Sequence, residues 1–257
     1  MRSGLSLAVA EVPVFAGHLL ECVAMRHIPL MLVGGLVLVV TRSANAANRG
    51  EEVERVVAVI RSPASKVASV ITRSRLEEET RIALISHGAT LAASQPLDRA
   101  ALKAGLDWLV DETLLNDEAE RLQVFEIDGA AGRGELARFQ ARFARAVDYQ
   151  SFLERCGLIE AELEVVLRRM LRVRRYVESR VSRAAQVSEA ETSMWFDRHA
   201  AEVGVRDRKL ARARLAEERV KSEVRGLARD LRSRAEVRIL DERLRQAAPV
   251  RGADGRG

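Results

Sequence analysis

The sequence predicts a mainly helical protein with short strands near both ends of its folded region. Three observations support this fold class. Ala, Arg, Leu, Val and Glu dominate a chain of which 31% is charged, a mixture typical of long helices with solvated faces. Apolar residues recur every three or four positions through most of the chain. Short β-branched or alternating runs lie at 53–60, 67–71 and 235–240.

An export signal precedes the folded region. It starts at Met25 with the basic residue Arg26, continues with an uncharged apolar run at 28–40, and ends in the small-x-small site ANA at 44–46. The run is too short for a transmembrane helix, which needs about 20 apolar residues. The sequence therefore predicts a signal peptide at 25–46 and a periplasmic protein.

Residues 1–24 hold a mildly apolar segment without a helix or strand period. Either the gene start is over-extended and Met25 is the true initiator, or the segment is a genuine leader extension. Residues 47–247 are long enough to form one domain with a core of its own. A polar, disordered tail is expected at 248–257.

Cysteine and histidine are scarce in this domain. Cys156 is the one cysteine outside the leader, so no intramolecular disulfide can form. We expect it to act as a small, partly buried hydrophobe, since a catalytic thiol needs a histidine partner and only His87 and His199 are available.

The first elements of the domain are short. The expected order is a strand at 53–60, a turn at 61–66, a strand at 67–71, a helix to about Ile85 and a loop at 89–96. The sequence Ser74-Arg75-Leu76-Glu77 has the form of a capping box and predicts where that helix begins.

The strongest helix is predicted at 97–122. Its apolar stripe comprises Leu102, Leu106, Leu109, Val110 and Leu114, widened by Trp108 and Leu115. The glycines of 129–134 predict a break. A helix marked by Leu136, Phe139, Phe143 and Ala146 follows, and then a short helical turn at 149–155 that Gly157 closes.

Two long helices complete the domain. The first covers 160–181, with one face formed by Leu163, Val166, Leu167, Met170, Val173 and Val177. A second capping box, at 188–191, opens a helix that carries Met194, Trp195 and Phe196. A highly charged helix at 206–234 leads into the strand at 235–240, where Val237 and Ile239 alternate with charged residues.

Sequence signatures of catalysis are absent. The chain has no phosphate-binding loop, no H-E-x-x-H, no C-x-x-C and no G-x-S-x-G. Residues 132–137 fit a loose G-x-G-x-x-A pattern, but no series of parallel strands surrounds them, so we interpret them as a linker. The sequence predicts no catalytic, cofactor-binding or metal-binding residues, and a protein that is not an enzyme.

The order of these segments resembles the SurA family of periplasmic chaperones. The segments that carry the resemblance are VERVVAVI at 53–60, ALKAGLDWLVDETLLNDEAERL at 101–122, the helix pair at 142–181, VSEAETSMWFDRHAAE at 187–202 and LARDLRSRAEVRIL at 227–240. The resemblance implies a curved helical core in which the late strand at 237–240 pairs with the early strand at 56–60.

The resemblance also implies a function in protein folding and outer-membrane biogenesis, without ATP or any other cofactor. The partners would be unfolded or extended exported polypeptides. Family members usually carry a parvulin domain after the helix of Trp195, and this chain has no room for one between His199 and Arg206. Peptidyl-prolyl isomerase activity is therefore not expected.

A chaperone of this kind needs an apolar surface that captures side chains. The candidate peptide-binding residues are Trp108, Leu115, Phe139, Phe143, Met170, Met194, Trp195 and Phe196. The competing interpretation is that apolar residues at helical spacing belong to the core.

Two other functions stay open at this point. One is a structural or adaptor subunit of an envelope assembly. The other is an Arg-rich nucleic-acid binder, which the helix at 206–234 invites. Its interspersed carboxylates cancel much of the positive field, and export would take it away from nucleic acid, so we expect no nucleic-acid partner. No membrane span is expected after signal cleavage, and the oligomeric state is open.

Overall fold

The computed structural model describes residues 54–123, 125–182, 186–199 and 208–245. The predicted leader, signal peptide and C-terminal tail lie outside the described residues. Within those ranges the protein is mainly helical, with nine helices and one three-stranded antiparallel sheet. The predicted fold class is confirmed at this level.

The helices and strands largely follow the predicted order. The strands are β1 (Val56–Arg61), β2 (Ser69–Thr72) and β3 (Glu236–Ile239). The helices are α2 (Arg73–Ser86), α3 (Thr90–Ser94), α4 (Arg99–Arg121), α5 (Gly129–Gln140), α6 (Ala146–Cys156), α7 (Glu160–Val181), α8 (Glu189–His199), α9 (Arg208–Arg234) and α10 (Glu242–Arg245).

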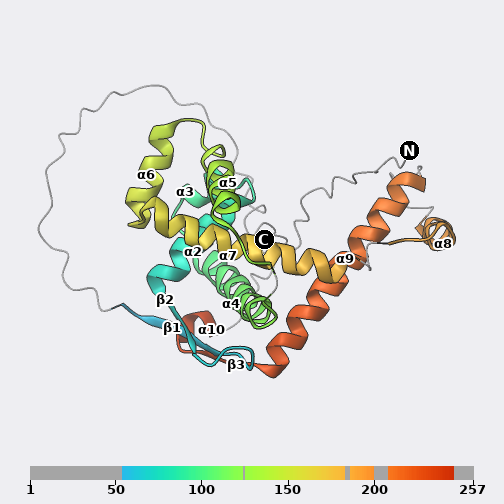
Figure 1. Cartoon of the computed structure of the whole chain (residues 1–257), viewed down its shortest axis with the longest axis horizontal. Helices are drawn as coiled ribbons and strands as arrows, with labels where there is room; N and C mark the ends of the chain where they lie inside the picture. Colours follow the sequence, from blue (N-terminus) through green and yellow to red (C-terminus); the bar gives the residue numbers. More distant parts are fainter. Residues whose placement is uncertain (1–53, 124, 183–185, 200–207, 246–257) are drawn as a thin grey trace, which may run out of the picture.

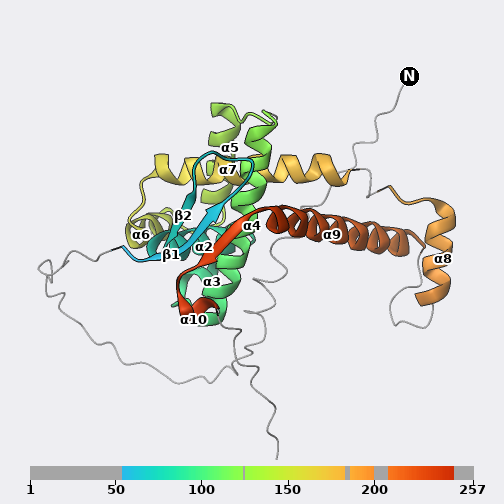
Figure 2. The ribbon, with the colours of Figure 1, turned by 90° about the horizontal axis from the view of Figure 1, so that it is seen from below.

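The molecule consists of a body and an arm. The sheet and helices α2 to α7 form the body, from which α9 projects and carries α8 at its outer end (Figures 1 and 2). Helix α4 lies at the centre of the body, in contact with α2, α7, α9 and α10. Its predicted apolar stripe is buried throughout, as expected for the helix around which the others pack.

The sheet joins the two ends of the folded region. Its order is β2-β1-β3, so the first strand lies between its hairpin partner and the last strand. Ile60 pairs with Val237, and Val59 with Arg238. The pairing of the late strand with the early strand was predicted, but its antiparallel direction was not. The register of β1 against β2 shifts between Val56 and Ala58, a β-bulge that increases local twist.

Helix α7 spans the predicted residues. Leu163, Val166, Leu167, Val173 and Val177 are buried in the main core, and Met170 is half-buried against it. Ile159 precedes the helix where a hydroxyl residue would usually cap it. Instead, the Glu162 carboxylate accepts a hydrogen bond of 3.0 Å from the Ile159 backbone N–H, which satisfies one of the donors at this end.

The arm is anchored at its base. Val220, Val224 and Leu231 of α9 are buried in the main core. Arg232 donates to the Asp111 carboxylate and, from Nη2 at 2.6 Å, to the Asp107 carbonyl, both on α4. The outer end of the arm has a small core of its own, and the base contacts hold it in position through one continuous helix.

One prediction about the glycine-rich segment is wrong. Residues 129–134 do not break the chain but form the first half of α5, which the Asp128 side chain caps by accepting from the Ala131 N–H at 2.6 Å. A Cβ at Gly132 would lie 2.7 Å from a Glu164 carboxylate oxygen and 2.8 Å from Arg168. A glycine is needed at this position because α5 packs closely on α7. The interpretation of 132–137 as a linker is therefore wrong as well, since these residues lie within α5.

Several helices also differ from the prediction. Helix α2 is capped by Thr72, whose hydroxyl accepts from the Arg75 N–H at 3.4 Å, rather than by a box at Ser74. The expected loop at 89–96 contains α3, and the carbonyls of Ala93 in α3 and of Gln95 just after it accept from Arg81. The helix expected at 136–146 ends at Gln140, and Ala146 begins α6, which Gly157 closes in the left-handed conformation as predicted.

Candidate functional site

The eight predicted peptide-binding residues fall into two separate groups. Trp108, Leu115, Phe139, Phe143 and Met170 belong to the body, and Met194, Trp195 and Phe196 belong to α8 on the arm. The structure therefore does not bring them together on one surface.

Most of the body group contributes to the core. Trp108, Leu115 and Phe139 are 7%, 0% and 3% exposed. Phe139 and Phe143 belong to an aromatic cluster with Tyr149 and Phe152, with ring centroids 5.5 to 5.7 Å apart. Phe143 and Met170 are half-buried against this core. These side chains stabilise the body in the conformation described, and their contact with a client stays a prediction.

The arm group includes the most exposed member of the set. Met194 is 61% exposed, whereas Trp195 is 5% exposed and forms a small core with Ala211. Phe196 and Leu215 are half-buried around that core. Leu210, which directly precedes Ala211 on α9, is 40% exposed. The outer end of the arm thus offers apolar side chains to solvent beside a small buried pair.

Specific polar contacts hold α8 on α9. The Trp195 indole N–H donates to the Glu218 carboxylate at 3.2 Å, and the Trp195 ring stacks on His199 with centroids 4.1 Å apart. Arg219 pairs with Glu191 at 2.6 Å. The capping box at Ser188 forms as predicted, because the Ser188 hydroxyl accepts from the Glu191 N–H and the Glu191 carboxylate accepts from the Ser188 N–H. The two helices therefore form a defined unit.

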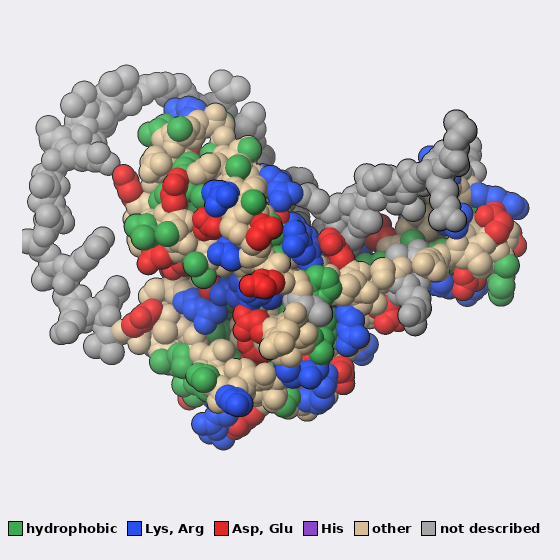
Figure 3. Space-filling view, viewed as in Figure 1, with side chains coloured by type: hydrophobic (Ala, Val, Ile, Leu, Met, Phe, Trp, Pro, Cys, Tyr) green, Lys and Arg blue, Asp and Glu red, His purple; other side chains and the backbone are tan. Residues whose placement is uncertain are grey.

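Basic and acidic side chains are mixed on the visible face (Figure 3). On α9, Lys221 pairs with Glu217 and Arg234 with Asp230, each four residues away along the helix. Arg232 pairs with Asp111 of α4. Each such pair neutralises one cation, but α9 still carries more Lys and Arg than Asp and Glu.

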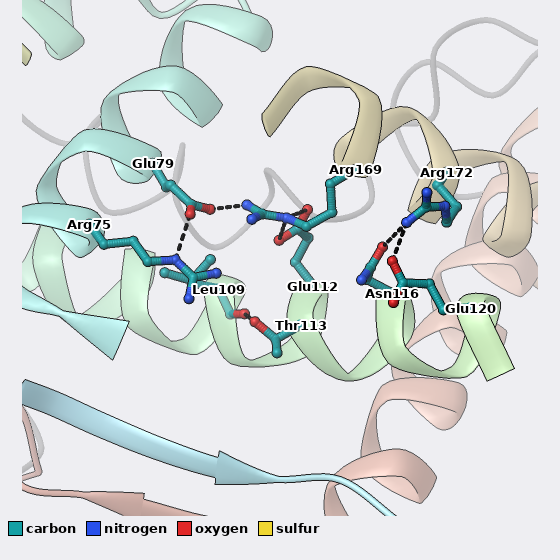
Figure 4. A network of polar contacts seen from close by, with 9 residues as sticks. All are labelled: Arg75, Glu79, Leu109, Glu112, Thr113, Asn116, Glu120, Arg169 and Arg172. Atoms are coloured by element: carbon teal, nitrogen blue, oxygen red, sulfur yellow. Dashed lines mark hydrogen bonds and ion pairs between the residues drawn. The ribbon is translucent and has the colours of Figure 1, made fainter. Parts of the chain in front are cut away.

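A second polar cluster lies inside the body, between α2, α4 and α7 (Figure 4). The Arg169 guanidinium of α7 points between Glu79 of α2 and Glu112 of α4 and bonds both carboxylates. Arg75 approaches Glu79 from its other side at 2.7 Å. A separate pair of contacts, from Arg172 to Asn116 and Glu120, continues the row along α4.

The ionisation of this cluster follows from burial and pairing. Burial raises the pKa of Glu112, and the facing Arg169 opposes that rise. Burial acts to lower the pKa of Arg169, but Glu112 and Glu79 outweigh it and hold the pKa above its usual value. The carboxylates are thus occupied by guanidinium groups, an arrangement that fixes the helices relative to one another.

Burial also shifts the pKa of Glu78, Asp117 and Cys156. Burial and the neighbouring Glu79 raise the pKa of Glu78 to about 7. Burial raises the pKa of Asp117 to about 6. Burial also raises the pKa of the Cys156 thiol to about 11, which keeps it protonated at neutral pH. A protonated, half-buried thiol agrees with the predicted role of Cys156 as a small hydrophobe.

Metal ligands do not gather anywhere in the described ranges: no three His, Cys, Asp or Glu side chains there could hold an ion together. In the same ranges, no helix has the length and apolar character needed to cross a bilayer.

Comparison with known proteins gives no match. No protein-family model, no curated protein and no solved structure matches this chain.

Sequence reasoning missed Leu210 as a surface residue. Periodicity alone cannot tell which apolar positions of a helix are covered by a partner. One signal was available: Leu210 and Ala211 are adjacent, so they point in different directions, and only one of them can face α8.

Proposed function

We propose that the chain is an ATP-independent chaperone-like protein that binds unfolded exported polypeptides in the periplasm. The observation that carries the proposal is the α8–α9 arm, which stands away from the body and offers Met194 and Leu210 at its outer end. Exposed methionine suits a surface that accepts varied side chains, because the thioether is flexible and polarizable. The pairing of the last strand with the first agrees with the resemblance to the SurA family.

The body supports the arm in this role. A client that binds the outer end of the arm would pull on the base of α9. Buried apolar residues and Arg232 hold that base on the body. The α2–α4–α7 polar cluster in turn fixes α4, on which the arm rests. Binding without nucleotide would be of modest affinity, since an unfolded segment loses entropy when it is held.

The proposal is tested with residues 47–257 and a urea-unfolded porin. We expect the purified protein to slow porin aggregation, measured by light scattering, more than albumin does at equal mass and without nucleotide. Equal scattering with albumin would contradict a chaperone function and favour an adaptor subunit, whose partner would be a folded protein.

A pair of matched variants locates the binding surface. Met194→Gln with Leu210→Gln removes apolar surface from the arm, and we expect it to weaken protection of the porin. Val147→Gln with Val165→Gln removes comparably exposed side chains from the body, at 58% and 65% exposure, and serves as the control. If the two double variants protect the porin equally, the arm is not the binding surface.

Export is tested separately. We expect N-terminal sequencing of the protein recovered from periplasmic extracts to begin at Ala47, after cleavage behind the ANA site. Recovery of an uncleaved chain from the cytoplasm would contradict the proposed location.

A further inference from the structure

One face of helix α9 carries a row of exposed side chains that begins with an apolar residue at the outer end of the arm and continues with charged residues. Leu210, Arg214, Glu218, Lys221, Arg225 and Arg229 follow one another at spacings of four, four, three, four and four residues. Residues at these spacings lie on one face of a helix. We call this set the arm stripe. Its members are exposed except for Lys221, which is half-buried.

Three arginines of the arm stripe have no acidic partner among the described residues. Glu218 accepts from the Trp195 indole and Lys221 pairs with Glu217. Arg214, Arg225 and Arg229, in contrast, form no ion pair with any carboxylate of the described residues. Helix α9 as a whole contains ten Lys and Arg but four Asp and Glu. The pairing described above therefore leaves a local excess of positive charge on this face.

We propose that the arm stripe docks extended polypeptide segments in which a bulky apolar residue is followed by carboxylates. Leu210, with Met194 at the same end of the arm, would take the apolar residue, and Arg214, Arg225 and Arg229 would pair with the acids. The inference rests on the proposed function in one respect: that function supplies the reason to expect an extended, unfolded ligand.

The spacing of the stripe sets the length of the segment. At a rise of about 1.5 Å per residue, Leu210 and Arg229 are separated by roughly 28 Å along the helix. An extended chain covers that distance in about eight or nine residues, at roughly 3.3 Å each. Carboxylates distributed over one strand-length segment can therefore reach all three arginines while its apolar residue contacts Leu210.

Polypeptide fits this surface better than nucleic acid. Binding of single strands uses exposed aromatic rings on which bases stack. The tryptophan of the arm is buried and its ring is stacked on His199. The large apolar side chains that the described residues of α8 and α9 expose are not aromatic, namely Met194 and Leu210, and such side chains favour contact with another apolar side chain.

The test compares two labelled ten-residue peptides that differ only in charge. Both carry Leu-Phe at one end, and one has three Asp where the other has three Asn. Exposed ion pairs are individually weak, so we expect the Asp peptide to bind residues 47–257 about tenfold more tightly at low ionic strength. The preference should disappear in 0.5 M salt, which screens exposed charges.

Charge-reversal variants assign the preference to the arm stripe. Arg214→Glu, Arg225→Glu and Arg229→Glu together should reverse it. The matched control is Lys66→Glu, Arg175→Glu and Arg243→Glu, three exposed cations outside the arm that also lack a carboxylate partner in the described ranges. It changes net charge equally and should leave the preference within about twofold, because the attraction between charges falls with their separation and these three residues lie outside the arm stripe. Circular dichroism checks that both variants are folded.

Three outcomes would overturn the inference: equal affinities for the two peptides, an equal effect of both charge reversals, or tighter binding of a single-stranded oligonucleotide of matched charge. The porin assay separates the two proposals. Protection of porin without a charge preference leaves the chaperone function and removes the docking site. A stripe-dependent charge preference without protection leaves the docking site and removes the chaperone function.

Discussion

Arg169 of α7 donates from Nε to both carboxylate oxygens of Glu112 of α4, at 3.0 Å each. The same guanidinium bonds Glu79 of α2, so one cation connects three helices of the body. Glu79 and Glu112 are almost fully buried. Buried charges of this kind contribute less to net stability than to the definition of one arrangement, because their desolvation offsets much of their attraction.

Removing the cation should destabilise the body. Arg169→Met leaves two buried carboxylates without their partner, and we expect a loss of about 3 to 5 kcal/mol in the free energy of unfolding by urea. Arg174→Met removes an exposed arginine that pairs with Glu135, and should cost at most about 1 kcal/mol. Similar losses in the two variants would show that the cluster has no special role. The triple change of Glu79, Glu112 and Arg169 to Met should recover part of the stability.

Two glycines in long helices should respond to alanine with opposite signs. Gly105 of α4 faces Thr80 of α2, and a Cβ there would lie 2.1 Å from the Thr80 hydroxyl oxygen. Gly105→Ala should therefore lower the melting temperature despite the better helix propensity of alanine. Gly226 of α9 has no atom within 4 Å of such a Cβ, so Gly226→Ala should stabilise the protein by up to about 1 kcal/mol. A rise in melting temperature for Gly105→Ala would contradict the close packing of α2 on α4.

Stability should fall as the pH rises towards 7. The pKa of Glu78 is raised from 4.5 to about 7, because it is partly buried and lies near Glu79 and Glu162. The folded protein therefore holds this proton more tightly than the unfolded chain, and the stabilisation is complete below pH 4.5 and lost as the pH passes 7. Urea midpoints measured from pH 4.5 to 8 should decline less in Glu78→Gln than in the unchanged protein.

A second carboxyl separates this effect from a general pH dependence. The pKa of Asp117 is raised from 3.8 to about 6, so Asp117→Asn should reduce the decline mainly between pH 4 and 6. If both variants keep the full decline, other groups cause it.

The outer edge of the sheet should depend on an arginine. Arg245 of α10 donates to the Ile239 carbonyl of β3 from Nε at 3.1 Å and from Nη2 at 2.6 Å. Unpaired backbone groups on an edge strand invite pairing with another chain. We expect Arg245→Ala to increase self-association, measured by light scattering after size exclusion, whereas Arg243→Ala on the same helix should not. An unchanged mass for Arg245→Ala would mean that the rest of α10 is sufficient to protect the edge.

The helices with strong apolar periodicity could be predicted from the sequence. Helix α7 was predicted with its observed ends and α4 to within two residues, because a stripe such as Leu102, Leu106 and Leu109 has one stable solution, a helix with that face buried. The capping box at Ser188 and the closing glycine at 157 could also be predicted, because their hydrogen bonds and backbone angles are local.

The glycine-rich start of α5 could not be predicted in this way. Glycine favours a break when local propensity decides, and it favours close helix packing when a neighbour is present. The neighbour of Gly132 is α7, whose Glu164 and Arg168 come from a distant part of the chain. A single sequence does not reveal that proximity.

The same distinction between local pattern and tertiary contact applies to the candidate site. The sequence by itself determined which positions are apolar, that α9 is rich in arginine and that the chain carries a predicted export signal. Only the tertiary structure decided that Trp108 and Leu115 are buried while Met194 and Leu210 are exposed, and which arginines have carboxylate partners. The physical reason is that periodicity defines a face of a helix, whereas burial and ion pairing depend on whether another element covers that face.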